Sequence, residues 1–344
     1  MTLSQETFRQ IVLRVRPTGM PVASDFAIDT VPIPVPEEGE FVVRNLYVSL
    51  DPAIRQRLSQ VDSYVKLIEI GGPLTSTTLG EVVASENLKA SVGDHVVGFH
   101  TVAEYSLATW TPLTRHVDLA AAASPSNHLS VLGPTGLTAY FGLLDIGKPQ
   151  PGETVLVSTA AGAVGSVAAQ IARIKGCRVV GIAGGSEKCE LLTEVFGLDA
   201  AINYQGLDLA SLTAAIRQAA PDGVDVYFDN VGGIQLDAAL DCLNLRGRVA
   251  LCGLISHYNA AGEIPPFTNF FRLIAKTARI EGFTVLTYAE QFPQALAELA
   301  GWVADGRIVF REHIEKGIES GISAFLRLFD GSNRGKMMLD LQGE

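Results

Sequence analysis

The sequence has fewer basic than acidic side chains, and it has no long uninterrupted apolar run. Its 344 residues carry 26 lysines and arginines against 37 aspartates and glutamates, a formal net charge of −11. A chain of this sign offers no electrostatic footprint for DNA, RNA or an anionic membrane surface. The most apolar long window, 129–147, is interrupted by Pro134, several glycines and Asp145. We therefore expect neither a nucleic-acid partner nor a membrane-spanning segment.

Cysteine is also scarce, and none of it forms a CxxC motif. The four cysteines, Cys177, Cys189, Cys242 and Cys252, lie in or beside apolar segments. This usage predicts reduced, buried thiols and a cytoplasmic location. The first residues, MTLSQETFRQ, do not place an apolar stretch after a basic one, so we expect no secretory signal.

The apolar residues that are present are numerous enough for two domains. Hydrophobic residues make up 47% of the chain, and single cores rarely grow beyond ~250–300 residues. Residues 1–125 contain short segments rich in β-branched residues between turn signals, which indicate a partly antiparallel sheet or barrel. From residue 154 strands and helices alternate, as in a parallel sheet with helices on both faces.

These patterns predict an α/β protein with a doubly wound parallel sheet and a separate β-rich domain. The tail that follows residue 306 is too short for a third domain, so we expect it to complete the first one. We predict one domain from residues 1–127 and 306–344 and a second from residues 128–305.

A loop of small residues follows the first strand of the alternating region. The chain reads TVLVSTAAGAVG at 154–165, and a helical pattern comes next, which is the position of a dinucleotide-binding fingerprint. Gly162 would let the backbone approach a pyrophosphate, and Gly165 would let the helix pack closely on the sheet. Ala160 replaces the first glycine of GxGxxG, and a tight turn in another α/β enzyme is the alternative. The predicted cofactor-binding loop comprises Ala160, Gly162, Ala163, Val164 and Gly165.

The end of the second strand lacks the carboxylate that an NAD site uses to bind the ribose 2′-hydroxyl. It reads RVVGIAGGSEK, and Gly185, Ser186 and Lys188 follow the strand. A serine hydroxyl and a lysine charge suit a 2′-phosphate, so the pattern favours NADP(H). The alternative is that Lys188 is a solvated charge at a helix start, beside Glu187.

Seven segments, taken in order, resemble one enzyme family. They are NLYVSLDPAIR, GLTAYFGL, AAGAVG, DNVGG, CGLISHYN, EGFTV and GSNRGKMML. The chain resembles the zinc-free branch of the medium-chain dehydrogenase/reductase superfamily, which includes prostaglandin reductases, alkenal double-bond reductases and curcumin-reductase-like enzymes. The resemblance implies a GroES-like catalytic domain built from both chain ends around a Rossmann domain. It also implies NADPH-dependent reduction of a carbon–carbon double bond conjugated to a carbonyl, and a homodimer.

The resemblance also assigns roles to single residues. It implies that Lys188 and Tyr204 lie in the 2′-phosphate pocket, that Asn230 lies beside the cofactor, and that Asn333 faces the pyrophosphate. Near the nicotinamide ribose it implies Cys252 and Gly253. Near the nicotinamide itself it implies Thr138, and it implies that the backbone of Phe283 and Val285 meets the nicotinamide amide.

Two tyrosines are the candidate catalytic residues. Without a metal, the carbonyl of an enone or enal must be polarised by hydrogen bonds, and a donor aimed at its oxygen stabilises the transition state. Tyr258 in SHYN is the first candidate, and its alternative is a tyrosine that only packs or holds the cofactor. Tyr47 in NLYVSLDP is expected to line the cleft, or else to be a half-buried strand aromatic.

Two segments depart from the family pattern near the expected substrate cleft, and both bear on substrate preference. The chain has Pro134 and Thr135 where relatives commonly have Met-Pro. Ala53 and Ile54 stand where relatives often have Tyr-Met.

The residues of a catalytic zinc site are absent from the positions where the zinc-dependent branch has them. No cysteine occurs before Cys177, and the region of the GHE motif reads LGEVV, with Leu79 and Gly80 in place of glycine and histidine. We therefore predict a metal-free enzyme and surface or turn positions for the six histidines. A quinone reductase of the same superfamily and a non-catalytic NADPH-binding protein are the rival interpretations.

The 2′-phosphate assignment predicts a selective effect of Lys188→Ala. Loss of one charge-assisted hydrogen bond should weaken NADPH binding by about ten- to a hundredfold and leave NADH binding nearly unchanged. Fluorescence titration with both nucleotides measures this difference. An equal loss for NADPH and NADH would contradict the assignment.

Overall fold

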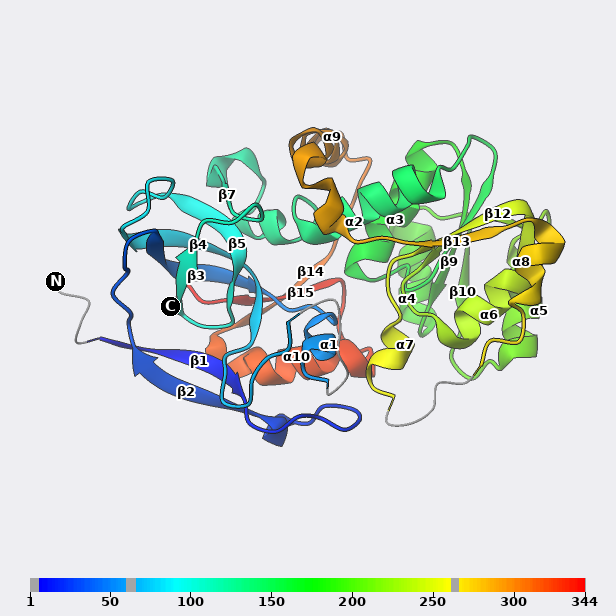
Figure 1. Cartoon of the computed structure of the whole chain (residues 1–344). Helices are drawn as coiled ribbons and strands as arrows, with labels where there is room; N and C mark the ends of the chain where they lie inside the picture. Colours follow the sequence, from blue (N-terminus) through cyan, green and yellow to red (C-terminus); the bar gives the residue numbers. More distant parts are fainter. Residues whose placement is uncertain (1–5, 60–65, 261–265, 344) are drawn as a thin grey trace. The chain divides into compact units, whose positions relative to one another are not determined.

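A computed structural model of the protein describes residues 6–59, 66–260 and 266–343. The chain divides into two compact units (Figure 1), one of Met1–Gly133 with Glu312–Glu344 and one of Pro134–Arg311. The predicted domain boundaries at 127/128 and 305/306 stay a prediction. Residues 1–5, where we looked for a secretory signal, lie outside the described residues.

The first unit is built on a seven-stranded sheet with the order β14-β15-β3-β4-β5-β7, in which β6 also pairs with β3. The pairs β15–β3, β3–β4 and β4–β5 are antiparallel, whereas β14 and β15 are parallel. A separate antiparallel hairpin joins β1 and β2. The elements of this unit are β1 (Thr7–Leu13), β2 (Phe26–Pro32), β3 (Glu40–Ser49), α1 (Ile54–Arg57), β4 (Thr75–Ser85), β5 (His95–Thr101), β6 (Tyr105–Thr109), β7 (Arg115–His116), β14 (Glu312–Lys316), α10 (Gly321–Asp330) and β15 (Lys336–Asp340).

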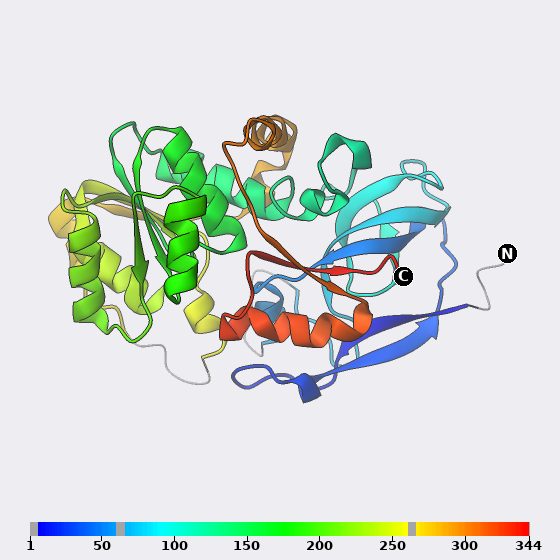
Figure 2. The same cartoon turned by 180° about the vertical axis from the view of Figure 1, so that it is seen from behind.

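The C-terminal segment is an integral part of this first unit. Helix α10 lies over the β1–β2 hairpin (Figure 2), where Phe325 packs edge-on against Phe26. Lys336 is only 2% exposed, donates a hydrogen bond to the Leu50 carbonyl at 3.2 Å and pairs with Asp51. The GSNRGK and SLDP segments therefore meet through a partly buried ion pair.

The second unit is built on a six-stranded parallel sheet with the order β10-β9-β8-β11-β12-β13. Its strands are β8 (Thr154–Val157), β9 (Arg178–Ala183), β10 (Ala200–Asn203), β11 (Val224–Asp229), β12 (Leu243–Leu251) and β13 (Arg279–Gly282). Its helices are α2 (Pro134–Phe141), α3 (Ala163–Ile174), α4 (Ser186–Glu190), α5 (Leu209–Ala219), α6 (Gly233–Cys242), α7 (Ile255–Tyr258), α8 (Phe271–Lys276) and α9 (Phe292–Ala304). Short 3-10 or π turns of the two units are η2 (Ala23–Asp25), η3 (Leu119–Ala121), η4 (Pro125–Leu129), η5 (Gly142–Gly147), η6 (Leu191–Val195), η7 (Val285–Gln291) and η8 (Ile318–Ser320).

Helices cover both faces of this parallel sheet. Leu212 and Ile216 of α5 pack with Leu236 of α6 against Val180 and Tyr227 of the strands, and these side chains form part of one buried cluster. Parallel crossovers are right-handed, so connections that run in opposite directions along a sheet lie on opposite faces. Helix α3 therefore covers the face opposite α5 and α6 (Figure 1). The predicted α/β class, with a doubly wound parallel sheet and a separate mixed sheet, is confirmed.

Two histidines do not follow the prediction of surface or turn positions. His100 and His128 are each 6% exposed. The His100 ring shares a 2.8 Å hydrogen bond between its Nδ1 and Thr78 Oγ1, and burial lowers its pKa to about 4. The neighbours of His100 in sequence gave no sign of this burial, because alternation along a strand does not say which face of the sheet is covered. His128 lies instead in the turn η4.

Within the described ranges, no helix combines the length and the apolar character that crossing a bilayer requires.

Candidate functional site

The loop between β8 and α3 begins at the carboxyl end of β8 and ends at the helix N-terminus. Ala160 is fully buried, and its N–H donates to the Ile182 carbonyl of β9 at 3.0 Å. Gly162 has an extended backbone and is the N-cap of α3, and its N–H donates to the Thr159 carbonyl at 2.8 Å. The loop is thus tied to the neighbouring strand at its start and folded back on itself before the helix.

The start of α3 is tightly packed on one side and accessible on the other. A Cβ built on Gly165 would lie 2.3 Å from the Thr159 carbonyl oxygen, so only glycine fits there. Gly162, Ala163 and Val164 are partly exposed. The first N–H groups of a helix have no acceptor within the helix, and with the helix dipole they favour an anion. This twelve-residue helix therefore fits a pyrophosphate.

The ends of β9 and β10 form a second part of the site. Ala183 and Asn203 are partners in the parallel pairing of the two strands. The Asn203 Oδ1 accepts hydrogen bonds from the Gly185 N–H at 2.9 Å and the Gln205 N–H at 3.1 Å. Gly185 has φ +86°, a conformation that favours glycine. Asn203 was missed by sequence reasoning, and its position at a strand end was the available signal.

The other predicted residues of the 2′-phosphate pocket surround this turn. A Cβ built on Gly184 would lie 3.3 Å from Tyr204 Cε1, so the tyrosine ring lies against the turn. Ser186 begins α4 and is exposed. Lys188 follows Glu187 in the same helix and is partly exposed. The adjacent strand ends thus bring Gly185, Ser186, Lys188 and Tyr204 into one region.

The ends of β8 and β11 are joined by side-chain hydrogen bonds. The Asn230 N–H donates to Ser158 Oγ at 2.8 Å, and its Nδ2 donates to the Ser158 carbonyl at 2.7 Å. Ser158 Oγ lies 3.2 Å from Asp229 Oδ1, to which it donates. The connections that follow β8 and β11 run in opposite directions along the sheet, and ligands of doubly wound folds bind at such a switch point.

The end of β12 adjoins the same place. The Cys252 and Gly253 N–H groups donate to the Asp229 carbonyl at 2.8 and 3.1 Å. A Cβ built on Gly253 would lie 3.3 Å from the Tyr258 hydroxyl and 3.4 Å from the Asn230 carbonyl oxygen. Burial raises the pKa of the Cys252 thiol to about 12, so this cysteine is a neutral thiol. Asn230, Cys252, Gly253 and Tyr258 therefore form one cluster.

Three further predicted residues lie elsewhere in the second unit. Phe283 follows β13, and its ring fills the space beside Gly142, where a built Cβ would lie 2.2 Å from Phe283 Cζ. The Thr138 hydroxyl donates to the Pro134 carbonyl at 2.7 Å within α2. Val285 is partly exposed at the start of η7.

Tyr47 and Asn333 belong to the first unit. Tyr47 is buried in β3 opposite Asp340, and burial raises the pKa of its phenol. The Asn333 Nδ2 donates to the Gly335 carbonyl at 3.0 Å. Tyr47 therefore has the surroundings of a strand aromatic, and its catalytic role and that of Asn333 at the cofactor stay predictions.

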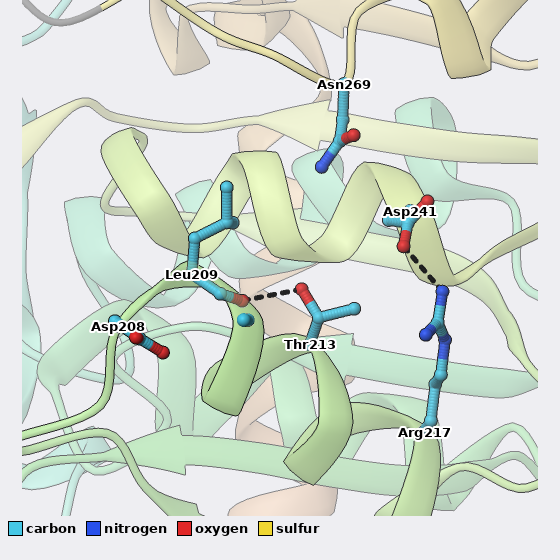
Figure 3. A pocket seen from close by; sticks show the side chains of 7 residues that line it. Asp208, Leu209, Thr213, Arg217, Asp241 and Asn269 are labelled. Carbon is cyan, nitrogen blue, oxygen red and sulfur yellow. Dashed lines mark hydrogen bonds and ion pairs between the residues drawn. The ribbon is translucent and has the colours of Figure 1, made fainter.

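A surface groove of the second unit contains none of the predicted residues. Figure 3 shows it between α5 and α6, where Arg217 pairs with Asp241 at 2.5 Å and the Thr213 hydroxyl donates to the Leu209 carbonyl at 2.7 Å. These polar side chains thus already have partners within the protein, and we assign the groove no ligand.

Two parts of the chain match known protein families, and its whole length is similar to known reductases. Residues 9–115 match a family described as the N-terminal domain of oxidoreductase, and residues 163–301 match a family described as zinc-binding dehydrogenase. The NADPH-dependent curcumin reductase of Escherichia coli (strain K12) is 39% identical over 98% of this chain and 97% of its own length. The NADP(+)-dependent 2-alkenal reductase of Nicotiana tabacum is 39% identical over 98% of both chains.

The chain belongs to the zinc-free branch of the medium-chain dehydrogenase/reductase superfamily. A solved structure, CurA from Vibrio vulnificus in complex with NADPH, supports this with a TM-score of 0.91, 38% identity, and coverage of 98% of this chain and 100% of that one. The predicted family and enzyme class are therefore confirmed: the protein is an NADP-dependent oxidoreductase.

The family whose description mentions zinc is matched only by residues 163–301 of this chain. In the part of the chain that the structure describes, no three His, Cys, Asp or Glu side chains are grouped as a metal ion would need. The metal-free reaction remains our proposal.

The packing of α3 against its loop predicts that Gly165→Ala is harmful. In an open helix this change stabilises by about 0.5–1 kcal/mol, but here the new methyl would overlap the Thr159 carbonyl and cost about 1–3 kcal/mol. NADPH affinity should also fall, on the order of tenfold. Urea unfolding and NADPH titration measure both effects.

Gly301→Ala is the matched control, because Gly301 is an exposed helical glycine of α9 with nothing within 4 Å of its built Cβ. It should stabilise the protein and leave NADPH affinity unchanged. A Gly165→Ala variant as stable as the Gly301→Ala variant would refute the steric argument.

Proposed function

We propose that this protein reduces the carbon–carbon double bond of α,β-unsaturated aldehydes or ketones with NADPH and without a metal ion. The observation that carries the proposal is the gathering of Asn230, Gly253 and Tyr258 at the switch point of the parallel sheet. Relatives that are named for curcumin reduction and 2-alkenal reduction, each 39% identical over nearly the whole chain, support it.

The residues of the second unit would hold the cofactor in three places. The backbone of Gly162, Ala163, Val164 and Gly165 would bind the pyrophosphate. Ser186, Lys188 and Tyr204 would surround the 2′-phosphate, and Asn230, Cys252 and Gly253 would adjoin the nicotinamide ribose. We further propose that the backbone at Phe283 and Val285 meets the nicotinamide amide, that Thr138 lies near the nicotinamide, and that Asn333 of the first unit faces the pyrophosphate. When bound, NADPH supplies the hydride that adds to the β-carbon of the alkene.

Tyr258 would act on the substrate oxygen. As the β-carbon is reduced, negative charge moves onto the carbonyl oxygen, and a hydroxyl donor aimed at that oxygen stabilises the resulting enolate more than it stabilises the enone. Tyr258 is partly exposed and its hydroxyl lies beside the Gly253 backbone, which suits this role. Tyr47 is our second candidate at the substrate.

We also propose that the two units are a GroES-like catalytic domain and a Rossmann domain of a cytoplasmic homodimer. The entry of β14 and β15 into the sheet of the first unit supports the discontinuous catalytic domain.

NADPH oxidation followed by absorbance tests the reaction class. A short enal should be reduced at the double bond, with a saturated aldehyde as product, whereas a simple quinone should be a poor acceptor. Saturated product is identified by mass spectrometry. Rapid quinone reduction without enal turnover would replace the proposed function with a quinone reductase activity.

The role of Tyr258 predicts a specific kinetic defect in Tyr258→Phe. Loss of a donor to a developing oxyanion costs about 10²–10³ in kcat, whereas the aromatic ring that packs by Gly253 is kept. We therefore expect kcat for the enal to fall by at least about tenfold and the Kd of NADPH to change less than about threefold. A variant with normal kcat would show that the hydroxyl only fills space.

A further inference from the structure

Asp229, at the end of β11, is fully buried and its two carboxylate oxygens differ sharply in their surroundings. Its Oδ2 has no hydrogen-bond partner among the described residues. Its Oδ1 accepts from the Tyr227 hydroxyl at 2.8 Å, Ser158 Oγ at 3.2 Å, the Val231 N–H at 2.9 Å and the Gly232 N–H at 3.0 Å. Hydrogen bonds donated to a carboxyl oxygen in this way favour the ionised form of the group.

This carboxylate is a costly way to make those contacts. Within the described residues no basic side chain pairs with Asp229, and burial raises the pKa of its carboxyl. An asparagine could accept the same bonds through its amide oxygen without burying a charge. Hydrogen bonding alone therefore does not account for an acid here, and uncompensated buried charges are typical of functional sites.

The backbone of Asp229 adjoins the residues proposed to surround the nicotinamide. Asp229 directly precedes Asn230, and its carbonyl accepts the N–H groups of Cys252 and Gly253. The nicotinamide ring is neutral in NADPH and carries one positive charge in NADP⁺, while the rest of the two molecules is the same. A fixed anion beside this ring would therefore act on one form and not on the other.

We propose that the buried Asp229 carboxylate stabilises the oxidised cofactor relative to the reduced one, and so favours release of the hydride. The inference rests on the proposed placement of the nicotinamide beside Asn230, Cys252 and Gly253. Two unit charges roughly 10 Å apart, at an effective dielectric constant of about 20, change a binding ratio on the order of tenfold.

The test compares the Kd of NADP⁺ with the Kd of NADPH, by calorimetry, in the wild type and in Asp229→Asn. The amide keeps an acceptor for Tyr227, Val231 and Gly232, removes the charge, and places an NH2 group where the unpartnered Oδ2 was. NADP⁺ should bind on the order of tenfold more weakly relative to NADPH than in the wild type. Asp229→Ser is made in parallel, because a serine hydroxyl can also accept from the turn N–H groups if the amide variant does not fold.

Asp237→Asn is the matched control. Asp237 is a buried acid of α6 in the same unit, and its carboxylate accepts the Thr268 hydroxyl at 2.6 Å and the Asn269 N–H at 2.7 Å, away from the switch point. Its variant should leave the ratio of the two Kd values unchanged.

The outcomes separate the two proposals. A shift of the ratio in the Asp229 variants alone supports the inference. An unchanged ratio, or an equal shift in Asp237→Asn, overturns it and leaves the reductase function intact. Failure of the wild-type protein to bind either nucleotide would instead remove the proposed function.

Discussion

The parallel pairing of β8 with β11 is the constraint on which the arrangement of the second unit depends. Ser158 closes this pairing at the carboxyl end, since its Oγ and its carbonyl both bind Asn230. One side of the pair leads to the small-residue loop and α3, and the other leads to Asn230 and the Gly253 turn. A disturbance at this point would move both of these parts of the proposed cofactor site, because among the described strands β8 and β11 are the pair that joins them.

The electrostatics of the site differ from those of the whole chain. A protein with a net charge of −11 repels a polyanionic cofactor at long range, but salt screens such repulsion beyond about 8–10 Å. Short-range groups would therefore decide binding in the proposed site, namely the N-terminus of α3 at the pyrophosphate and Lys188 at the 2′-phosphate. The buried Asp229 carboxylate is then the local negative charge at the other end of the proposed site, where a positive charge develops in the reaction.

The parts of the site that the sequence could predict are those coded by local patterns. The strand, the small-residue loop and the helix at 154–174 are continuous in sequence, so the loop was evident. The missing acid after β9 pointed to NADP(H) for the same reason. Asn203 and Ser158 were not predicted, because their partners come from neighbouring strands and depend on the register of the parallel sheet. Burial of His100 depended likewise on which sheet face was covered.

Ala160 shows how a departure from the glycine fingerprint is accommodated. Its methyl group is buried under β9, where a Cβ built on Gly181 would lie 2.9 Å from it and still closer to Leu192 and Leu198. The absence of a side chain at Gly181 of the neighbouring strand thus leaves room for the methyl group of Ala160. Two positions that are far apart in sequence therefore share one steric requirement. Because residue 160 carries a side chain and the core beside it is closely packed, residue 181 must be a glycine.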